Sequence, residues 1–174
     1  MKVAPVGDDF EGAVFHNALF IDRPLYEGIA VYTGPLGTGP GRPVSIVDNT
    51  NGPGTGKWLD ISSTYGGTPA NGSYDTVFTM RFKKRYSVVS FDSHSVTGWE
   101  GDASASVQAL DAEGNVIADE AYSHTFPKSA INEPVTLGVA GAAKIKFLKF
   151  ETKSSGGEKM VWHSIRVDDL VVLD

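Results

Sequence analysis

Apolar and polar residues alternate along much of this chain, so that every second side chain is hydrophobic over several short stretches. A period of two is that of a β-strand with one buried and one solvated face. The clearest segments are residues 76–82, 86–92, 104–109, 134–139, 144–150 and 165–174. No stretch long enough for a helix repeats with a period of about 3.6 residues, so the pattern predicts strands throughout.

Strands separated by short turns, with no helices between them, predict an all-β fold, an antiparallel β-sandwich of the jelly-roll type. We expect a single domain over residues 1–174 and less than about 10% helix. A chain of 174 residues is long enough to bury a full hydrophobic core. The residues expected to fill this core are Phe78, Met80, Phe82, Val89, Phe91, Val107, Phe147, Ile165, Val167 and Val171.

Two irregularities are expected within this pattern. Residues 111–115 contain the glycine and polar residues of a hairpin turn, so residues 115–119 are predicted to form the return strand. Phe147 lies at an odd position whereas Phe150 lies at an even one, so both face the core only if the strand changes register. We therefore expect a bulge or twist near Leu148.

The last ten residues contain an unusual carboxylate. Asp169 shares its odd register with Ile165, Val167, Val171 and Leu173, and therefore falls on the apolar face of the predicted strand. Burying an unpaired carboxylate is costly. Either a bulge shifts the register at this point, or a cation or hydrogen-bond donors hold Asp169 inside the fold.

Composition excludes several classes of function. The net charge of −6 argues against nucleic acid as a partner, because binding to phosphates requires a basic surface. No apolar run approaches the about 20 residues that cross a bilayer, so we expect no membrane span. Cysteine is absent, which excludes disulfides and thiolate metal sites. No leader follows Met1, and the location, whether extracellular, cell-surface or virion, is left open.

Catalytic motifs are not found. Residues 52–57 resemble a phosphate-binding loop, but Asn51 stands where its first glycine should be and Trp58 where its Ser or Thr should be. The four histidines, at positions 16, 94, 124 and 163, lack metal-ligand spacing. We therefore expect a non-catalytic protein, although the two carboxylates of a glycosidase can lie far apart in sequence.

Acidic residues near both ends of the chain indicate a calcium site. The first and last strands of a sandwich often lie side by side, which would bring Asp9 and Glu11 close to Asp169. Clustered carboxylate oxygens are the ligands that calcium prefers. These three residues are the predicted ligands of a structural calcium ion. The alternative is two separate, solvated acidic pairs.

Aromatic residues in glycine-rich segments indicate a carbohydrate-binding surface. Sugar rings stack on exposed aromatic side chains, while nearby polar groups bind their hydroxyls. The predicted contacts are Trp99, Tyr65 and Trp58, supported by Asn71 and Asp102. The alternative is that these segments are plain surface connections.

Taken together, these segments resemble a jelly-roll family of bacterial surface and extracellular modules, related to galactose-binding-like domains and carbohydrate-binding modules. The resemblance is carried by residues 9–12 with 26–31, residues 89–92 with 107–116, and residues 165–170. It implies a β-sandwich that binds glycans, often with a bound calcium ion.

A second function is compatible with the same pattern. A module of this kind can serve as a structural or virion protein, such as a phage capsid decoration or a tail or adhesion domain. It would then act through contacts with a partner protein chain or with further copies of itself in a homo-oligomer.

Overall fold

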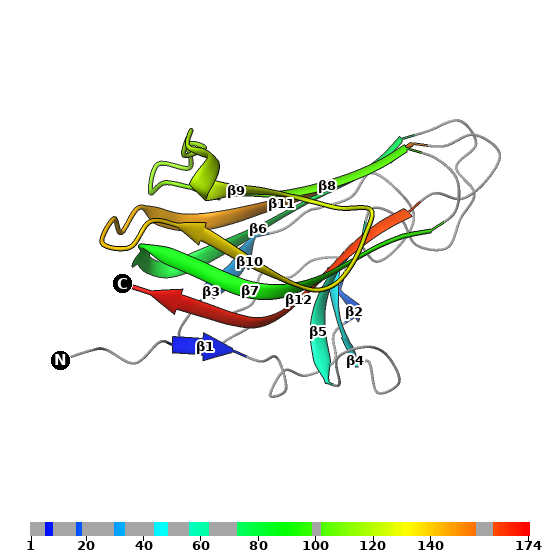
Figure 1. Cartoon of the computed structure of the whole chain (residues 1–174), viewed down its shortest axis with the longest axis horizontal. Helices are drawn as coiled ribbons and strands as arrows, with labels where there is room; N and C mark the ends of the chain where they lie inside the picture. Colours follow the sequence, from blue (N-terminus) through cyan, green and yellow to red (C-terminus); the bar gives the residue numbers. More distant parts are fainter. Residues whose placement is uncertain are drawn as a thin grey trace.

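Antiparallel strands in two layers form nearly all of the described architecture in a computed structural model of the chain (Figure 1). The structure describes residues 6–8, 17–18, 30–33, 44–48, 56–62, 73–98, 102–155 and 162–174. The strands are β1 (Val6–Asp8), β2 (Asn17–Ala18), β3 (Ala30–Thr33), β4 (Val44–Asp48), β5 (Lys57–Ser62), β6 (Ser73–Tyr86), β7 (Val88–Gly98), β8 (Asp102–Leu110), β9 (Ser123–Phe126), β10 (Ser129–Gly138), β11 (Ile145–Ser155) and β12 (Trp162–Leu173). The predicted all-β sandwich is confirmed.

The larger sheet has seven strands, in the order β10-β7-β12-β5-β4-β2, with β1 added alongside β12. The smaller sheet has five strands, in the order β3-β6-β11-β8-β9. In the described ranges helix is limited to the 3-10 turn η1 (Glu120–Tyr122), and no helix is long and apolar enough to span a membrane. The strand orders place segments that are distant in sequence side by side. Figure 1 shows this for β1 and β12, which are at the two ends of the colour scale.

The core lies between the facing sides of the two sheets. Eight of the ten residues predicted for it are buried, namely Phe78, Met80, Phe82, Val89, Phe91, Val107, Ile165 and Val167. The other two, Phe147 and Val171, are only partly buried, and that prediction was wrong for them. In both strands a register shift turns an adjacent residue inward instead, so Leu148, after Phe147, and Leu170, before Val171, are fully buried.

The register shift in β11 was expected and lies between Ile145 and Phe147. The return strand predicted at residues 115–119 was wrong. Only Val116 bridges back to Leu110 there, and η1 intervenes before β9 pairs with β8. The side chain of Asp119 caps η1 by accepting from the Ala121 amide at 3.0 Å, which diverts the chain from the hairpin.

A second register shift governs the last strand. Asp168 pairs with Asp92 of β7, and the next ladder pair is Val171 with Ser90, so β12 contains one extra residue. Asp169 occupies the bulge with a positive φ of 47°. On its other edge β12 pairs with β5 over Ser164–Val167 and then with β1 at Leu170–Val172. At the bulge, the strand paired with this edge of β12 changes from β5 to β1.

Gly138 and Gly141 provide a matched test of the packing at the β10–β11 turn, because both have positive φ. A Cβ on Gly138 would lie 2.9 Å from Ile145 Cδ1 and would overlap the Ser87 carbonyl, whereas one on Gly141 would meet nothing within 4 Å. We expect Gly141→Ala to lower the free energy of unfolding by about 1 kcal/mol and Gly138→Ala by roughly 2–4 kcal/mol. Urea denaturation measures both. Equal losses would contradict the close approach of the Gly138 backbone to Ser87.

Candidate functional site

A row of polar side chains crosses the outer face of the seven-stranded sheet. Ile165 and Val167 point into the core, so Arg166 between them points outward. In the ladders, Arg166 lies opposite Asp60 of β5 on one side and opposite His94 of β7 on the other. Directly opposed residues of antiparallel strands are near neighbours. The three side chains therefore form a continuous row across three strands.

Asp60 and Arg166 form an ion pair within this row. The Arg166 Nε donates to Asp60 Oδ2 at 3.1 Å, and the Ser164 hydroxyl donates to Asp60 Oδ1 at 2.8 Å. Burial raises the pKa of Asp60, against the lowering effects of the Ser164 hydrogen bond and the Arg166 charge. The Asp60 side chain is 14% exposed and that of Arg166 is 30% exposed, so the guanidinium is the member of the pair that solvent reaches.

His94 continues the row into β10. A register shift in the β10–β7 ladder leaves Asn132 with a positive φ of 50°, and its backbone N–H donates to His94 Nδ1 at 3.0 Å. Burial, with the nearby Arg166 charge, lowers the pKa of His94, so its ring is neutral at pH 7. Because Nδ1 accepts a hydrogen bond, the single proton of the neutral ring is on Nε2.

Trp58 packs edge-on against His94, with ring centroids 4.7 Å apart and planes inclined by 66°. Both residues are only 2% exposed. Among the described residues, neither Trp58 Nε1 nor His94 Nε2 has a hydrogen-bond partner. Buried polar groups are nearly always paired, so two adjacent unpaired N–H donors are the most distinctive chemical feature of this face.

Burial of Trp58 corrects the sequence-based prediction for this residue. It was expected to present an open ring to a sugar, but its position in β5 turns it onto the sheet, where it packs on His94. The other predicted contacts are not tested: Trp99, Tyr65 and Asn71 lie outside the described residues. Asp102 is the first residue of β8, and its side chain also lies outside the described part of the structure.

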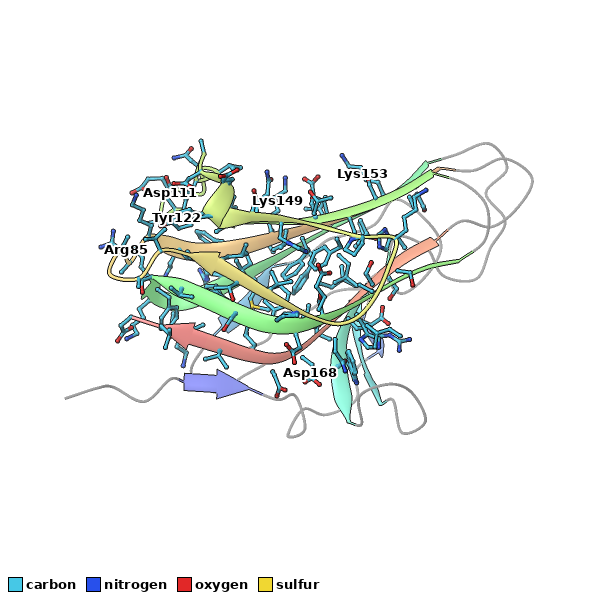
Figure 2. The ribbon with its side chains drawn as sticks, in the orientation of Figure 1. Arg85, Asp111, Tyr122, Lys149, Lys153 and Asp168 are labelled. Carbon is cyan, nitrogen blue, oxygen red and sulfur yellow. The ribbon has the colours of Figure 1, made fainter. Side chains whose placement is uncertain are left out.

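The carboxylates near the chain ends occupy a different part of the same sheet. The predicted pairing of the terminal strands is confirmed, with Asp8 of β1 opposite Leu170 of β12. Asp169, however, is exposed, and its N–H donates to Asp168 Oδ1 at 2.8 Å. The expectation that Asp169 faces the core was wrong because the bulge turns it outward, which was the alternative explanation. Figure 2 shows Asp168 on the side of β12 that faces away from the smaller sheet.

The predicted calcium ligands Asp9 and Glu11 lie outside the described residues. Within the described ranges no group of three or more His, Asp or Glu side chains is placed to hold a metal ion. Since Asp169 is solvated, the cost of burying it no longer requires a cation. The calcium site therefore stays a prediction that rests on the confirmed pairing of β1 with β12.

One histidine lies inside the sandwich. His163 is fully buried, and its Nε2 lies 2.6 Å from the Ser95 hydroxyl, which in turn donates to the Pro127 carbonyl. Because the serine proton is directed to that carbonyl, the imidazole Nε2–H donates to Ser95. This arrangement ties β12 to β7 and to the β9–β10 connection, and it does not activate the serine as a nucleophile.

Comparisons with known proteins concern the fold. No protein-family model matches the sequence, and no curated protein matches it. Solved structures match the chain in fold. A carbohydrate-binding module, CBM27-1 of Caldicellulosiruptor saccharolyticus in complex with mannohexaose, matches with a TM-score of 0.50 and 16% identity over 99% of this chain and 98% of its own. The K1 cleaved adhesin domain of Lys-gingipain from Porphyromonas gingivalis W83 matches with a TM-score of 0.52 and 13% identity, covering 98% of each chain.

The chain shares the jelly-roll sandwich fold of these modules. The glycoside hydrolase domain of Endo-D from Streptococcus pneumoniae R6 also matches, with a TM-score of 0.51 and 13% identity over 97% of this chain, but this chain covers only 27% of it. At such identities the likeness concerns architecture. Function must be inferred from the side chains.

The buried His163 generates a prediction about pH. Burial, with the charge of Lys128, lowers its pKa to about 4. The unfolded chain, with a histidine pKa of about 6.5, binds this proton more readily, so stability is lost as pH falls from about 6.5 to about 4. We expect the linkage to His163 to lower the free energy of unfolding by roughly 3 kcal/mol as the pH falls through this window. Below about pH 4 this residue should cause no further loss. Urea denaturation at pH 7 and pH 4, on the protein and on His163→Gln, measures the difference. An unchanged pH dependence in the variant would contradict it.

Proposed function

We propose that this protein is a non-catalytic carbohydrate-binding module whose ligand lies on the outer face of the seven-stranded sheet, over Arg166. The observation that carries the proposal is the fixed polar row on this face, in which the Arg166 guanidinium is held by Asp60 and is 30% exposed to solvent. Trp58 and His94 are each only 2% exposed, so they support the row from beneath while the guanidinium is the group that a ligand can reach.

The rigidity of the row favours recognition over a chance arrangement. Each of its members is held by a neighbour: Asp60 by Ser164 and Arg166, and His94 by the Asn132 amide. Side chains fixed before a ligand arrives lose little conformational entropy on binding. The fold adds support, because solved sandwiches of the same architecture include a module in complex with mannohexaose.

The loop residues predicted from the sequence extend this proposal. Trp99, Tyr65, Asn71 and Asp102 remain candidates for further sugar contacts. Loops at the rim of a sandwich commonly add to a binding surface that the sheet supports. Their contribution is separable from that of the sheet, because substitutions in the loops leave the Asp60–Arg166 pair intact.

A structural role, as in a virion or adhesion protein, is the second candidate. Its supporting observation is the exposure of large apolar side chains, including Ile131 at 64%, Val139 at 48% and Leu173 at 40%. Such residues can contact a partner chain or a second copy of this protein. Val139 and Leu173 lie at the ends of β10 and β12, whereas Ile131 is adjacent to Asn132, whose N–H donates to His94.

Affinity electrophoresis in gels containing soluble polysaccharides tests the proposal. We expect retardation in at least one polysaccharide, and we expect Asp60→Asn combined with Arg166→Gln, which removes the guanidinium without leaving a carboxylate unpaired, to reduce it several-fold. Lys149→Gln on the smaller sheet, whose side chain lies on the opposite outer surface in Figure 2, is the matched control and should bind normally. Failure to bind any glycan, together with self-assembly or capture of a shell protein, would favour the structural role.

We also propose a calcium ion ligated by Asp169 together with Asp9 and Glu11. An ion that binds only the folded state adds about 2.7 kcal/mol at a hundredfold excess over its Kd. We therefore expect EDTA to lower the Tm by about 5–10 °C and calcium to restore it. Asp169→Asn should abolish the response, because the amide tolerates positive φ but is a weaker ligand. Glu113→Gln, an equal charge change in the β8–β9 turn, should retain it. A melt that EDTA does not change would contradict the site.

A further inference from the structure

One end of the sandwich has an exposed apolar turn. The chain passes from β10 of the larger sheet to β11 of the smaller sheet through residues 139–143, Val-Ala-Gly-Ala-Ala, which contain no polar side chain. Val139 is 48% exposed, and Ala140 and Ala143 are exposed as well. Turns are usually rich in Asp, Asn and Ser, so this one is unusual. We name residues 139–143 the apolar turn.

The apolar turn lies beside the connection between β6 and β7. Gly138, which precedes it, pairs with Val88, and Ile145, which follows it, pairs with Tyr86. Both connections therefore cross between the two sheets at the same end of the sandwich, as Figure 1 shows. Leu173, which is 40% exposed, also pairs with Val88 and adds apolar surface to this end.

Cations border the apolar turn. The register shift between β11 and β6 sets residues 82–85 against residue 146 alone, and residues 83–85 are all exposed. Residues 83–86 and 138–146 contain no Asp or Glu. We name the cations of these two segments the basic rim, which consists of Lys83, Lys84, Arg85, Lys144 and Lys146.

Carboxylates neutralise little of the basic rim. Within the described ranges one of its five cations forms an ion pair, Lys84 with Asp174, and both side chains remain more than half exposed. The β8–β9 connection contains four acidic residues, Asp111, Glu113, Asp119 and Glu120. It lies at the same end, as Figure 2 shows for Asp111 and Arg85, but β11 separates it from β6. The basic rim is therefore a local positive surface on a chain of net charge −6.

Exposed apolar side chains bordered by cations fit the surface of an anionic membrane. The boundary of a bilayer accepts apolar side chains, while anionic headgroups attract Lys and Arg around them. Each such cation close to an anionic surface strengthens partitioning about fivefold, so several acting together are effective where a single exposed pair is not. A soluble polyanion would contact the basic rim and leave the apolar turn in water. A membrane uses both.

We propose that this end of the sandwich docks on anionic lipid headgroups, with the apolar turn inserted among them and the basic rim paired with their charges. Exposed charges farther away than about 10 Å are screened at physiological salt, so the acidic remainder of the chain opposes docking only weakly. The inference is independent of the proposed carbohydrate site. Arg166 precedes Leu173 by seven residues, which corresponds to roughly 20 Å along β12.

Sedimentation with lipid vesicles tests the docking. We expect the protein to bind vesicles of phosphatidylcholine and phosphatidylglycerol in equal parts at least tenfold more strongly than vesicles of phosphatidylcholine alone, and to be released by high salt. Equal binding to both kinds, or binding to neither, would overturn the inference. So would binding to heparin but not to vesicles, or self-association that Val139→Ser prevents in a protein that ignores vesicles. The polysaccharide gels test the carbohydrate site separately.

Two equally exposed valines separate insertion of the apolar turn from general hydrophobicity. Val139 is 48% exposed beside the basic rim, and Val116 is 47% exposed in the acidic β8–β9 connection. We expect Val139→Ser to weaken binding to the anionic vesicles at least threefold and Val116→Ser to leave it unchanged. Thermal melts check that both variants fold. Equal effects of the two substitutions would contradict the assignment of the apolar turn.

Paired charge variants test the basic rim. Lys83→Gln with Arg85→Gln should weaken vesicle binding at least tenfold, because both side chains are exposed and neither forms an ion pair among the described residues. The control, Lys149→Gln with Lys153→Gln, changes the net charge equally but farther along β11, where both lysines contact Glu151. We expect it to change binding less than threefold. Equal losses in the two double variants would show a response to net charge alone and overturn the docking surface.

Discussion

The register of β12 is the constraint on which the rest of this structure depends. This strand is central in the larger sheet and pairs with β7 along one edge and with β5 and then β1 along the other. Its sequence contains two apolar runs of opposite parity, Ile165 with Val167 and Leu170 with Val172, and all four residues are buried. Only an extra residue between the runs lets both face the core. Asp169 is that residue, and its side chain tolerates the positive φ that the bulge requires.

The outer-face row follows from the first of these two runs. With Ile165 and Val167 inside, Arg166 must lie outside, opposite Asp60 and His94. A second bulge, at Asn132 in the edge strand β10, frees a backbone N–H for His94. Each bulge therefore has a function beyond bending a strand. One sets which side chains face outward, and the other sets the protonated nitrogen of His94.

Burial of this row also has an energetic consequence. Desolvated donors without partners reduce the stability of the free protein, and proteins retain such features mainly at functional sites. The interior contact between His163 and Ser95 differs in this respect, because the imidazole donates to a hydroxyl that is itself bonded to Pro127. The His163–Ser95 contact therefore contributes to folding, whereas on the outer face the Trp58 and His94 N–H groups are buried without a partner among the described residues.

Local patterns in the sequence were sufficient for the strands and for most of the core. Alternation around Phe78 and Val89 does not depend on which strands become neighbours, so it could be read directly. The bulge in β12 appeared as an anomaly at Asp169, and the sequence left open whether a shifted register or a ligand explained it. The Asp60–Arg166 pair could not be foreseen, because residues 106 positions apart meet only through the register of β12 with β5. The loop aromatics Trp99 and Tyr65 remain predictions.

Cysteine scanning of β12 tests the register most directly, since the chain has no cysteine of its own. Single replacements of Asp169, Leu170, Val172 and Leu173 by Cys would be exposed to a thiol reagent under native conditions. The bulge predicts rapid labelling at positions 169 and 173 and protection at positions 170 and 172, because Leu170 and Val172 are buried while Asp169 and Leu173 are exposed. The opposite pattern, with 169 protected and 170 and 172 reactive, would show uninterrupted alternation and contradict the register on which the outer-face row depends.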